Sequence, residues 1–391
     1  MSQWDHNDSF ILLPELKLLS HWNPARYRNI YRAEKDSDFE VCPRCAIPSK
    51  SVHDRRWVKV SDQPIRGSGI CLKILKRRFR CLACKKVFTE PVQGVRKGHR
   101  TTERYRRGIR WACENYADLK RVTKAYQCSS WLVYKVFYEQ LALKTKQRQY
   151  PWPKTIGIDE HSFRRGKYGP EYASMIVDYN NKRIFEVAEG KTAVGLQEQL
   201  AHIEGRMGVR NVVLDMCDAF KKFAREHFPN AEMVADKFHV LRLLTPALNS
   251  RRKDITGDQR SNPVRKLLLR NGHSLKYFER SALQTWLDQH EVIREVYFYK
   301  EAIHRFYRTK GYDKAAAALI KLTDQMALSD LKEIKTLRKT LMKWRKEILA
   351  YFKTGLTNGR TEGYNRLAKL YQYRAFGYKS FKNYRLRLLN A

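Results

Sequence analysis

The middle of the chain alternates between short β-rich runs and amphipathic stretches of helical period. Three apolar runs follow one another between residues 155 and 190, and the polar letters YNNKR between the second and the third are typical of a turn. A helical pattern over 192–205, an apolar run over 209–214, a helical pattern over 219–228 and a last apolar run from 231 complete the alternation. This order predicts a mixed α/β sheet.

The pattern changes beyond Leu244 and reads as helix for about a hundred residues. Apolar residues recur at three- and four-residue steps from Leu331 to Phe352, which predicts one amphipathic helix that begins near Ser329 or Asp330. Such a stripe is typical of core packing, so we assign it no chemistry.

Two Cys-x-x-Cys pairs flank a stretch with strand-like alternation near the amino terminus. The four cysteines are Cys42, Cys45, Cys81 and Cys84. The stretch between the pairs predicts a β-hairpin, which would bring four thiolates to one structural zinc ion in a zinc ribbon. Free or redox-active thiols are the alternative, and Cys71 or His53 could replace one ligand.

Three helical patterns follow between residues 102 and 142, with Ser129 or Ser130 as the N-cap of the last one. Short helices joined by tight polar turns are typical of a helix-turn-helix, whose last helix enters the major groove of DNA. Any three-helix bundle gives the same pattern, and the basic residues favour DNA binding.

Composition points to a polyanionic partner. Lys and Arg total 78 against 40 Asp and Glu, a formal net charge of +38, and nucleic acid is the partner that best neutralises such an excess. A ribosome or a membrane surface are the alternatives. No apolar run approaches the roughly 20 residues of a membrane span, and the amino terminus lacks a secretory pattern, so we expect a cytoplasmic protein whose cysteines are not disulfide-bonded.

Two acidic residues end apolar runs of the expected sheet. Asp159 ends the first run and Asp215 ends the fourth, so the two carboxylates would lie side by side if those strands are neighbours. Adjacent carboxylates repel unless a divalent cation lies between them, and oxygen ligands select magnesium or manganese. A third acid from a later helix would complete a site suited to phosphodiester chemistry.

Several short motifs, in their order along the chain, resemble the ribonuclease-H-like DDE transposases of bacterial insertion sequences, specifically the ISL-three family. The resemblance covers the cysteine pairs, the helix-turn-helix and four further stretches: GIDEHSFRRG, VVLDMCDAF, VADKFHV and TNGRTEGYNRLAKLYQYRAFGY. Each motif is weak alone, and together they are specific.

The resemblance implies a metal-binding catalytic triad of Asp159, Asp215 and Glu362. It also implies a helical insertion before the last acid, and it makes Asp236 and His239 an auxiliary D-x-x-H element or, equally, a buried structural pair.

The other acids near these motifs have simpler interpretations. Glu160 would point to the opposite face of its strand, Asp178 would be a turn residue and Asp218 could cap a helix.

The expected fold is a multidomain α/β protein with a zinc ribbon, a helix-turn-helix and a ribonuclease-H-like mixed-sheet catalytic domain that carries a large α-helical insertion. The boundaries are 1–40 for an N-terminal segment, 41–95 for the ribbon, 98–148 for the helix-turn-helix, 152–248 for the first part of the catalytic core, 249–350 for the insertion and 351–391 for the last helices.

The expected function is cut-and-paste DNA transposition. The chain would bind terminal inverted repeats and target DNA, would act as a homodimer on DNA and would be associated with the bacterial nucleoid. A catalytically silent DNA-binding protein derived from a transposase is the first alternative. A serine or tyrosine recombinase is the second, and the sequence offers no nucleophile constellation for it.

Overall fold

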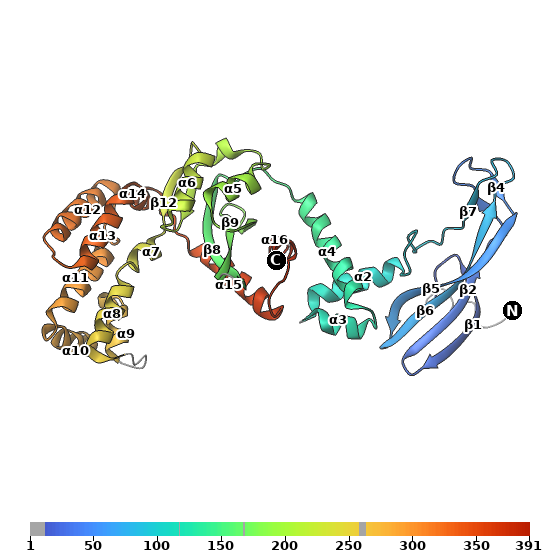
Figure 1. The fold of residues 1–391 in the computed structure, drawn as a ribbon, viewed down its shortest axis with the longest axis horizontal. Coiled ribbons are helices and arrows are strands. Elements are labelled where there is room, and N and C mark those ends of the chain that lie inside the picture. The colour runs from blue at the N-terminus through green and yellow to red at the C-terminus, as the bar shows by residue number, and fades with distance from the viewer. Residues whose placement is uncertain (1–11, 117, 167–168, 258–262) are drawn as a thin grey trace. The chain divides into compact units, whose positions relative to one another are not determined.

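The computed structural model describes residues 12–116, 118–166, 169–257 and 263–391, and the chain divides into two compact units (Figure 1). The first unit is Met1–Lys146 and the second is Gln147–Ala391. Each unit has a hydrophobic core of its own.

A β-sheet forms much of the first unit. Its strands lie in the order β1-β2-β6-β5, and β7 pairs with the end of β6. The bounds are Leu16–Ala25 for β1, Arg28–Lys35 for β2, Val52–Ile65 for β5, Ser68–Arg80 for β6 and Val87–Thr89 for β7. Strands β5 and β6 form the hairpin that the sequence predicts, and Arg66 and Gly67 turn it with φ of 51° and 77°.

Strands β1 and β2 belong to this sheet, although their sequence indicated no strand. Strand β2 pairs in parallel with β6, and only one face of β2 is buried, so buried Ala33 follows exposed Arg32. Because polar side chains occupy the other face, the short strand carries no strong apolar signal. A two-residue pair, β3 (Glu40–Val41) and β4 (Pro48–Ser49), holds the first cysteine pair.

Three helices complete the first unit: α2 (Glu103–Asn115), α3 (Leu119–Ala125) and α4 (Ser130–Gln147). Ser129 Oγ accepts the Leu132 N–H at the start of α4, as expected of an N-cap. The Thr102 hydroxyl caps α2 and donates to buried Asp62 on β5 at 2.6 Å, which fixes the first helix to the sheet.

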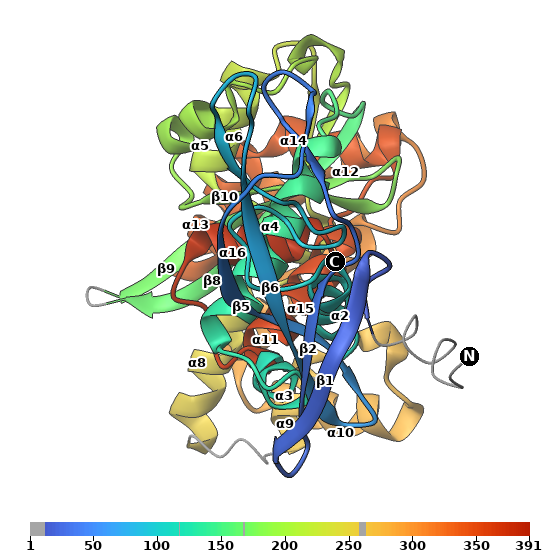
Figure 2. The ribbon, with the colours of Figure 1, turned by 90° about the vertical axis from the view of Figure 1, so that its right-hand side faces the viewer.

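The second unit contains a five-stranded mixed sheet in the order β10-β9-β8-β11-β12. Strands β8, β9 and β10 are antiparallel, and β11 and β12 run parallel to β8. The bounds are Thr155–Gly166 for β8, Gly169–Asp178 for β9, Arg183–Glu189 for β10, Asn211–Leu214 for β11 and Glu232–Ala235 for β12. Figure 2 shows β8 and β9 side by side as a long hairpin.

Helices cover both faces of this sheet. Helices α5 (Ala193–Leu200) and α6 (Asp218–His227) pack on one face with Ile156 and Ile158. Helices α15 (Gly359–Arg374) and α16 (Phe381–Leu389) pack on the other with Phe163 and Val177 (Figure 1). Successive side chains of β8 point to opposite faces of the sheet, so each packs against either α5 and α6 or α15 and α16.

A helical region lies between β12 and α15. Its helices are α7 (Lys237–Leu241), α8 (Thr245–Thr256), α9 (Pro263–Leu269), α10 (Tyr277–Asp288), α11 (Glu291–Phe306), α12 (Tyr312–Ala327), α13 (Lys332–Lys343) and α14 (Arg345–Thr354). The single helix expected over 331–352 is broken between α13 and α14 at buried Trp344. A residue distant in sequence contacts the break: Lys221 Nζ of α6 donates to the Lys343 carbonyl and lies 4.6 Å from the Trp344 ring centroid.

Within the described ranges, no helix combines the length and the apolar character that a membrane crossing requires.

Candidate active site

Asp159 and Asp215 meet beside the carboxyl end of β11, within the second sheet; Asp159 was expected to end its strand, but β8 continues to Gly166 because it pairs with β9 beyond this point. Strands β8 and β11 are parallel neighbours with Ile158 opposite Leu214, so the next residue of each chain segment is an aspartate. Asp159 is 8% exposed and Asp215 is 9% exposed. Burial raises the pKa of both carboxyl groups, and the Asp215 carboxylate raises the pKa of Asp159 further. The adjacency that the sequence predicts is therefore present.

Asp236 and His239 lie beside this pair. Asp236 follows β12 and caps α7, and its Oδ2 lies 2.8 Å from His239 Nδ1. The same imidazole nitrogen is 3.1 Å from Asp215 Oδ1. The hydrogen bond to Asp236 raises the pKa of His239, which favours the imidazolium. Ligand atoms of Asp215, Asp236 and His239 lie within 4.8 Å of one another, a grouping that could hold a metal ion.

Helix α15 supplies two buried amides to the aspartates. Asn365 Nδ2 donates to Asp159 Oδ2 at 2.7 Å, and Asn358 Nδ2 donates to Asp215 Oδ1 at 3.1 Å. The backbone N–H of Asn358 donates to Asp236 Oδ1 at 3.0 Å. These amides are neutral, so they orient the carboxylates without cancelling their charge.

Glu362 lies on α15 between these two asparagines. It follows Asn358 by four residues and precedes Asn365 by three, so all three share one side of the helix. Its side chain is 44% exposed and pairs with Arg366 Nη2 at 2.9 Å. Glu362 therefore lies within one helical turn of both asparagines, with a cation as its present partner.

A glycine allows α15 to approach the sheet this closely. A Cβ at Gly157 would lie 2.3 Å from Thr361 Oγ1 and 2.6 Å from the Tyr179 ring. Gly157 and Asp159 point to the same face of β8, two residues apart. The close packing over Gly157 thus brings the amides of α15 into reach of Asp159.

The three neighbouring acids have other partners. Glu160 pairs with Lys191 Nζ at 3.1 Å, although its charge still contributes to the raised pKa of Asp215. Asp178 Oδ1 accepts the backbone N–H groups of Asn180 and Asn181, as expected of a turn residue. Asp218 is the first residue of α6 rather than its cap and pairs with Lys343 at 2.5 Å, so the capping role expected for it is wrong.

His161 was not singled out from the sequence, yet it lies two residues beyond Asp159 on the same face of β8. It is 4% exposed, and its Nε2 lies 2.6 Å from the Tyr384 hydroxyl. Burial lowers the pKa of His161 to about 4, with the nearby Asn365 side chain opposing the shift. His161 is therefore a neutral ring beside Asn365.

The four predicted cysteines form a second cluster, in the first unit. The Sγ atoms of Cys42 and Cys84 are 3.5 Å apart, as are those of Cys45 and Cys81, and all four lie within 4.8 Å of one another. Ala46 and Lys85, which follow the two pairs, both have positive φ, near 60°. The paired turns and the all-sulfur donor set fit a tetrahedral structural zinc ion. Cys71 and His53 lie outside the cluster.

The first sheet also carries a basic, aromatic face. Residues on the side away from the core include Arg32 on β2, Lys73 on β6 and Trp57 on β5. The Arg32 guanidinium and the Lys73 ammonium lie 5.6 Å and 5.5 Å from the Trp57 ring centroid. Arg28 and Lys59 add charge. Burial raises the pKa of half-buried Cys71, and the charges of Arg28, Lys59 and Lys73 offset part of that rise. Cations interleaved with an exposed indole are typical of nucleic-acid interfaces.

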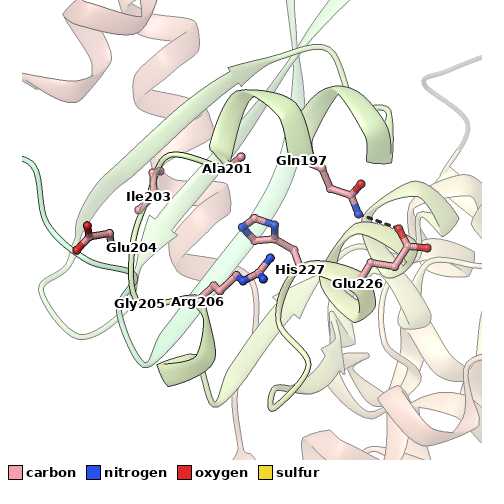
Figure 3. Close-up of a pocket in the computed structure, with 8 residues that line it drawn as sticks. All are labelled: Gln197, Ala201, Ile203, Glu204, Gly205, Arg206, Glu226 and His227. Carbon is pink, nitrogen blue, oxygen red and sulfur yellow. Dashed lines mark hydrogen bonds between the residues drawn. The ribbon is translucent and has the colours of Figure 1, made fainter.

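A separate pocket of about 690 Å³ opens near the start of β11 (Figure 3). Its lining residues are Gln197, Ala201, Ile203, Glu204, Gly205, Arg206, Glu226 and His227. Gln197 donates to Glu226 at 2.8 Å across it. Residues 203–206 precede β11 whereas Asp215 follows it, so this pocket lies at the opposite end of the strand from the carboxylate cluster.

Comparison with known proteins supplies the context for these sites. Residues 156–388 match the family model described as a transposase, that of the ISL3 (ISL-three) family. Residues 38–84 match the model described as the zinc-finger of transposase IS204/IS1001/IS1096/IS1165.

Two curated proteins show how far the similarity extends. The transposase for insertion sequence element IS1001 of Bordetella parapertussis is 24% identical over 382 residues, which covers 94% of this chain and 92% of that protein. The transposase for insertion sequence element IS1557 of Mycobacterium tuberculosis is 24% identical over 259 residues, or 58% of this chain and 57% of that protein.

Proposed function

Because this chain belongs to the ISL3 family of transposases, we propose that its carboxylate cluster cleaves and joins DNA strands at the ends of an insertion sequence. The observation that carries the proposal is the meeting of two buried aspartates, Asp159 within β8 and Asp215 directly after the parallel strand β11. Two such carboxylates with neutral amide partners have a strong electrostatic need for a divalent cation.

The sheet order supports a ribonuclease-H-like catalytic domain. Three antiparallel strands followed by two strands parallel to the first, with helices on both faces, is the arrangement that this fold requires. On this interpretation, the helical region from α7 to α14 is an insertion between the second and third acids.

The proposed metal ligands are Asp159, Asp215 and Glu362, and the proposed ion is magnesium or manganese. Oxygen donors alone are what these ions prefer, and the raised pKa values of the two aspartates reflect charge that a cation would stabilise. When bound, the metal would stabilise the charge that develops on the attacking and leaving oxygens of a phosphodiester. Glu362 would exchange its partner Arg366 for the metal.

The remaining residues of the site position these ligands. Asn365 and Asn358 each hold one aspartate oxygen. Asp236 and His239 could instead contribute to the metal site directly, since Asp215 lies within reach of both. Cleavage by water would release a 3′ hydroxyl at the element end, and attack of that hydroxyl on target DNA would join the strands without a covalent protein–DNA intermediate.

We assign DNA recognition to the first unit. Helices α3 and α4 would form a helix-turn-helix, with α4 as the recognition helix, and the zinc ribbon and the basic face around Trp57 would contact the duplex backbone. Two element ends must be held together for transposition, so a homodimer on DNA belongs to the proposal.

The test compares ligand substitutions on DNA that carries the element's own ends, with magnesium present. Asp159→Asn, Asp215→Asn and Glu362→Gln should each reduce cleavage and strand transfer at least about 1,000-fold, because each removes a charged ligand; that factor corresponds to about 4 kcal/mol of transition-state stabilisation. Gel-shift affinity for the ends should stay unchanged, because recognition lies in the first unit.

Glu160→Gln is the matched control, since Glu160 is adjacent in sequence but pairs with Lys191. It should retain substantial activity. Normal cleavage by Glu362→Gln would remove Glu362 from the triad and favour Asp236 in its place. If the unaltered protein binds the ends but does not nick them with magnesium or manganese, the chain is a silent DNA-binding derivative. A trapped protein–DNA adduct would indicate a recombinase.

A further inference from the structure

One side of helix α15 is exposed along its whole length and begins at Glu362. Glu362, Arg366, Lys369 and Tyr373 follow one another at steps of four, three and four residues, so they form one continuous stripe. The adjoining side is buried against the sheet through Thr361, Asn365 and Ala368. The exposed stripe therefore starts at the proposed metal site and leads away from it along the surface.

The stripe changes from basic to aromatic as it leaves the site. Arg366 and Lys369 are exposed on its first half. Tyr373 is 82% exposed at its end, and Phe376, in the loop after the helix, is 97% exposed. Single exposed apolar residues are common on protein surfaces, but two largely exposed rings in one short segment need an explanation.

Phe376 is held in place rather than left loose. Its φ is 53°, a left-handed conformation that a bulky residue rarely adopts, and Gly377 follows with φ of 92°. The Phe376 N–H donates to the Tyr373 carbonyl at 3.1 Å, and the Gly377 N–H donates to the Gln372 carbonyl at 2.9 Å. A strained conformation that presents an apolar ring to water is the kind of outlier that marks functional sites.

The loop is also anchored to the sheet on both sides of the rings. Gln372 Nε2 donates to the Ser162 and Phe163 carbonyls of β8 at 3.0 Å and 3.1 Å. Arg164 Nη1 donates to the Lys379 carbonyl at 2.7 Å, beyond the rings. Tyr373 and Phe376 are thus fixed relative to strand β8, which also carries Asp159.

We propose that this stripe binds the DNA strand next to the cleaved bond, and that Tyr373 and Phe376 stack on bases that are unpaired there. The proposal rests on the proposed function and specifies which surface holds the strand. Phosphates would pair with Arg366 and Lys369, and flat rings are the surfaces on which unpaired bases stack.

The dimensions of the stripe suit a short single-stranded segment. Eleven residues separate Glu362 from Tyr373, which at 1.5 Å per residue is about 16 Å. A stacked strand rises about 3.4 Å per nucleotide, so the rings would meet bases roughly five nucleotides from the metal site.

The test measures binding of the full chain to two synthetic duplexes of arbitrary sequence, with calcium replacing magnesium to prevent cleavage. One duplex is blunt, and the other has a short single-stranded 3′ extension that contains 2-aminopurine. The unaltered protein should bind the extended duplex about 5- to 100-fold more tightly than the blunt one and should quench the 2-aminopurine fluorescence, as stacking on one or two rings requires.

Tyr373→Ala combined with Phe376→Ala should abolish both the preference and the quenching, while affinity for the blunt duplex stays within about twofold. Phe376→Trp should retain both effects, and Phe376→Leu, which keeps an apolar side chain without a ring, should lose most of the quenching. Tyr277→Ala is the matched control, because Tyr277 in α10 is 88% exposed and lies outside the stripe; it should behave like the unaltered protein.

Retention of preference and quenching by the double variant would overturn the proposal, as would equal binding of the two duplexes by the unaltered protein. Neither result depends on cleavage. A result against base stacking by this stripe is therefore distinct from a result against the proposed metal ligands. The cleavage assay with Asp159→Asn, Asp215→Asn and Glu362→Gln tests those ligands separately.

Discussion

Two neutral amides hold the charged centre of this protein. The Asp159 carboxylate accepts two hydrogen bonds. The backbone N–H of Glu160 donates to Oδ1 at 2.7 Å, and Asn365 Nδ2 donates to Oδ2 at 2.7 Å. A lysine or arginine in place of Asn365 would satisfy the same oxygen but would also cancel charge that a metal needs. An amide fixes the direction of the carboxylate while preserving its attraction for a cation.

We expect Asn365→Ala to lower the free energy of unfolding by about 1–3 kcal/mol, because a buried carboxylate oxygen loses its donor. DNA cleavage should fall at least about tenfold, since a misdirected ligand costs at least about 1.4 kcal/mol in the transition state. Urea denaturation and a cleavage assay measure the two effects. Asn383→Ala on α16 is the control, and cleavage unaffected by Asn365→Ala would contradict a positioning role.

At the residue scale, the sequence predicted some contacts and not others for a physical reason. Asp159 and Asp215 each end an apolar run of the sequence, and the parallel pairing of those two runs brings the residues that follow them together. The contacts of Asn358 and Asn365 depend on how a helix about two hundred residues later packs on β8. No local pattern encodes that packing, so these partners became evident only in the structure.

At the element scale, the decisive contact is that of α15 with β8. Thr361 is fully buried and lies over Gly157, and the Tyr179 hydroxyl donates to the Thr357 carbonyl just before the helix. Any side chain at position 157 would displace the helix and, with it, both asparagines and Glu362.

Gly157→Ala should therefore destabilise the second unit by about 1–3 kcal/mol through overpacking, and it should reduce cleavage more than an equally destabilising change elsewhere. Gly208→Ala is the matched control, because a Cβ there meets nothing within 4 Å. Combining Gly157→Ala with Thr361→Ala should restore part of the stability. Thermal unfolding and cleavage assays measure these effects. A fully active Gly157→Ala variant would show that the close contact between α15 and β8 is dispensable.

Elements with strong periodicity were predicted well, and those shaped by their neighbours were not. The mixed sheet and the β5–β6 hairpin follow from alternation and turn residues. The break at Trp344 depends on a lysine from α6, and strand β2 depends on pairing with β6, so neither has a local signal. A helix carrying Glu362 was expected, but its close packing over Gly157 of β8 was not.

At the scale of the whole molecule, the protein consists of two units with separate cores. The four-cysteine cluster belongs to the first unit, where Cys42 and Cys81 are almost fully buried. The carboxylate cluster belongs to the second. Binding of structural zinc is coupled to folding, so loss of zinc should affect one unit and spare the other.

Cys42→Ser should remove the one zinc ion per chain that we expect, and it should lower the melting temperature of the first unit. The transition of the second unit should stay within about 2 °C of its original value, less than the shift that about 1 kcal/mol produces in a domain of its size. Metal analysis and calorimetry measure these effects. Cys71→Ser should keep its zinc, because Cys71 lies outside the four-cysteine cluster. Full zinc content after replacement of all four cysteines would refute the assignment.

The distance along the chain from β8 to α15 determines when a ribosome would complete the proposed site. About two hundred residues separate Asp159 from Glu362, which at roughly 5–20 residues per second takes about 10–40 s to synthesise. The first unit leaves the ribosome before any of the acids. On the proposed function, a growing chain can engage DNA close to its own gene before it is able to cut, which biases it toward the element that encodes it. A product that stops before Asn358 would occupy element ends without cleaving them and would act as an inhibitor of the intact enzyme.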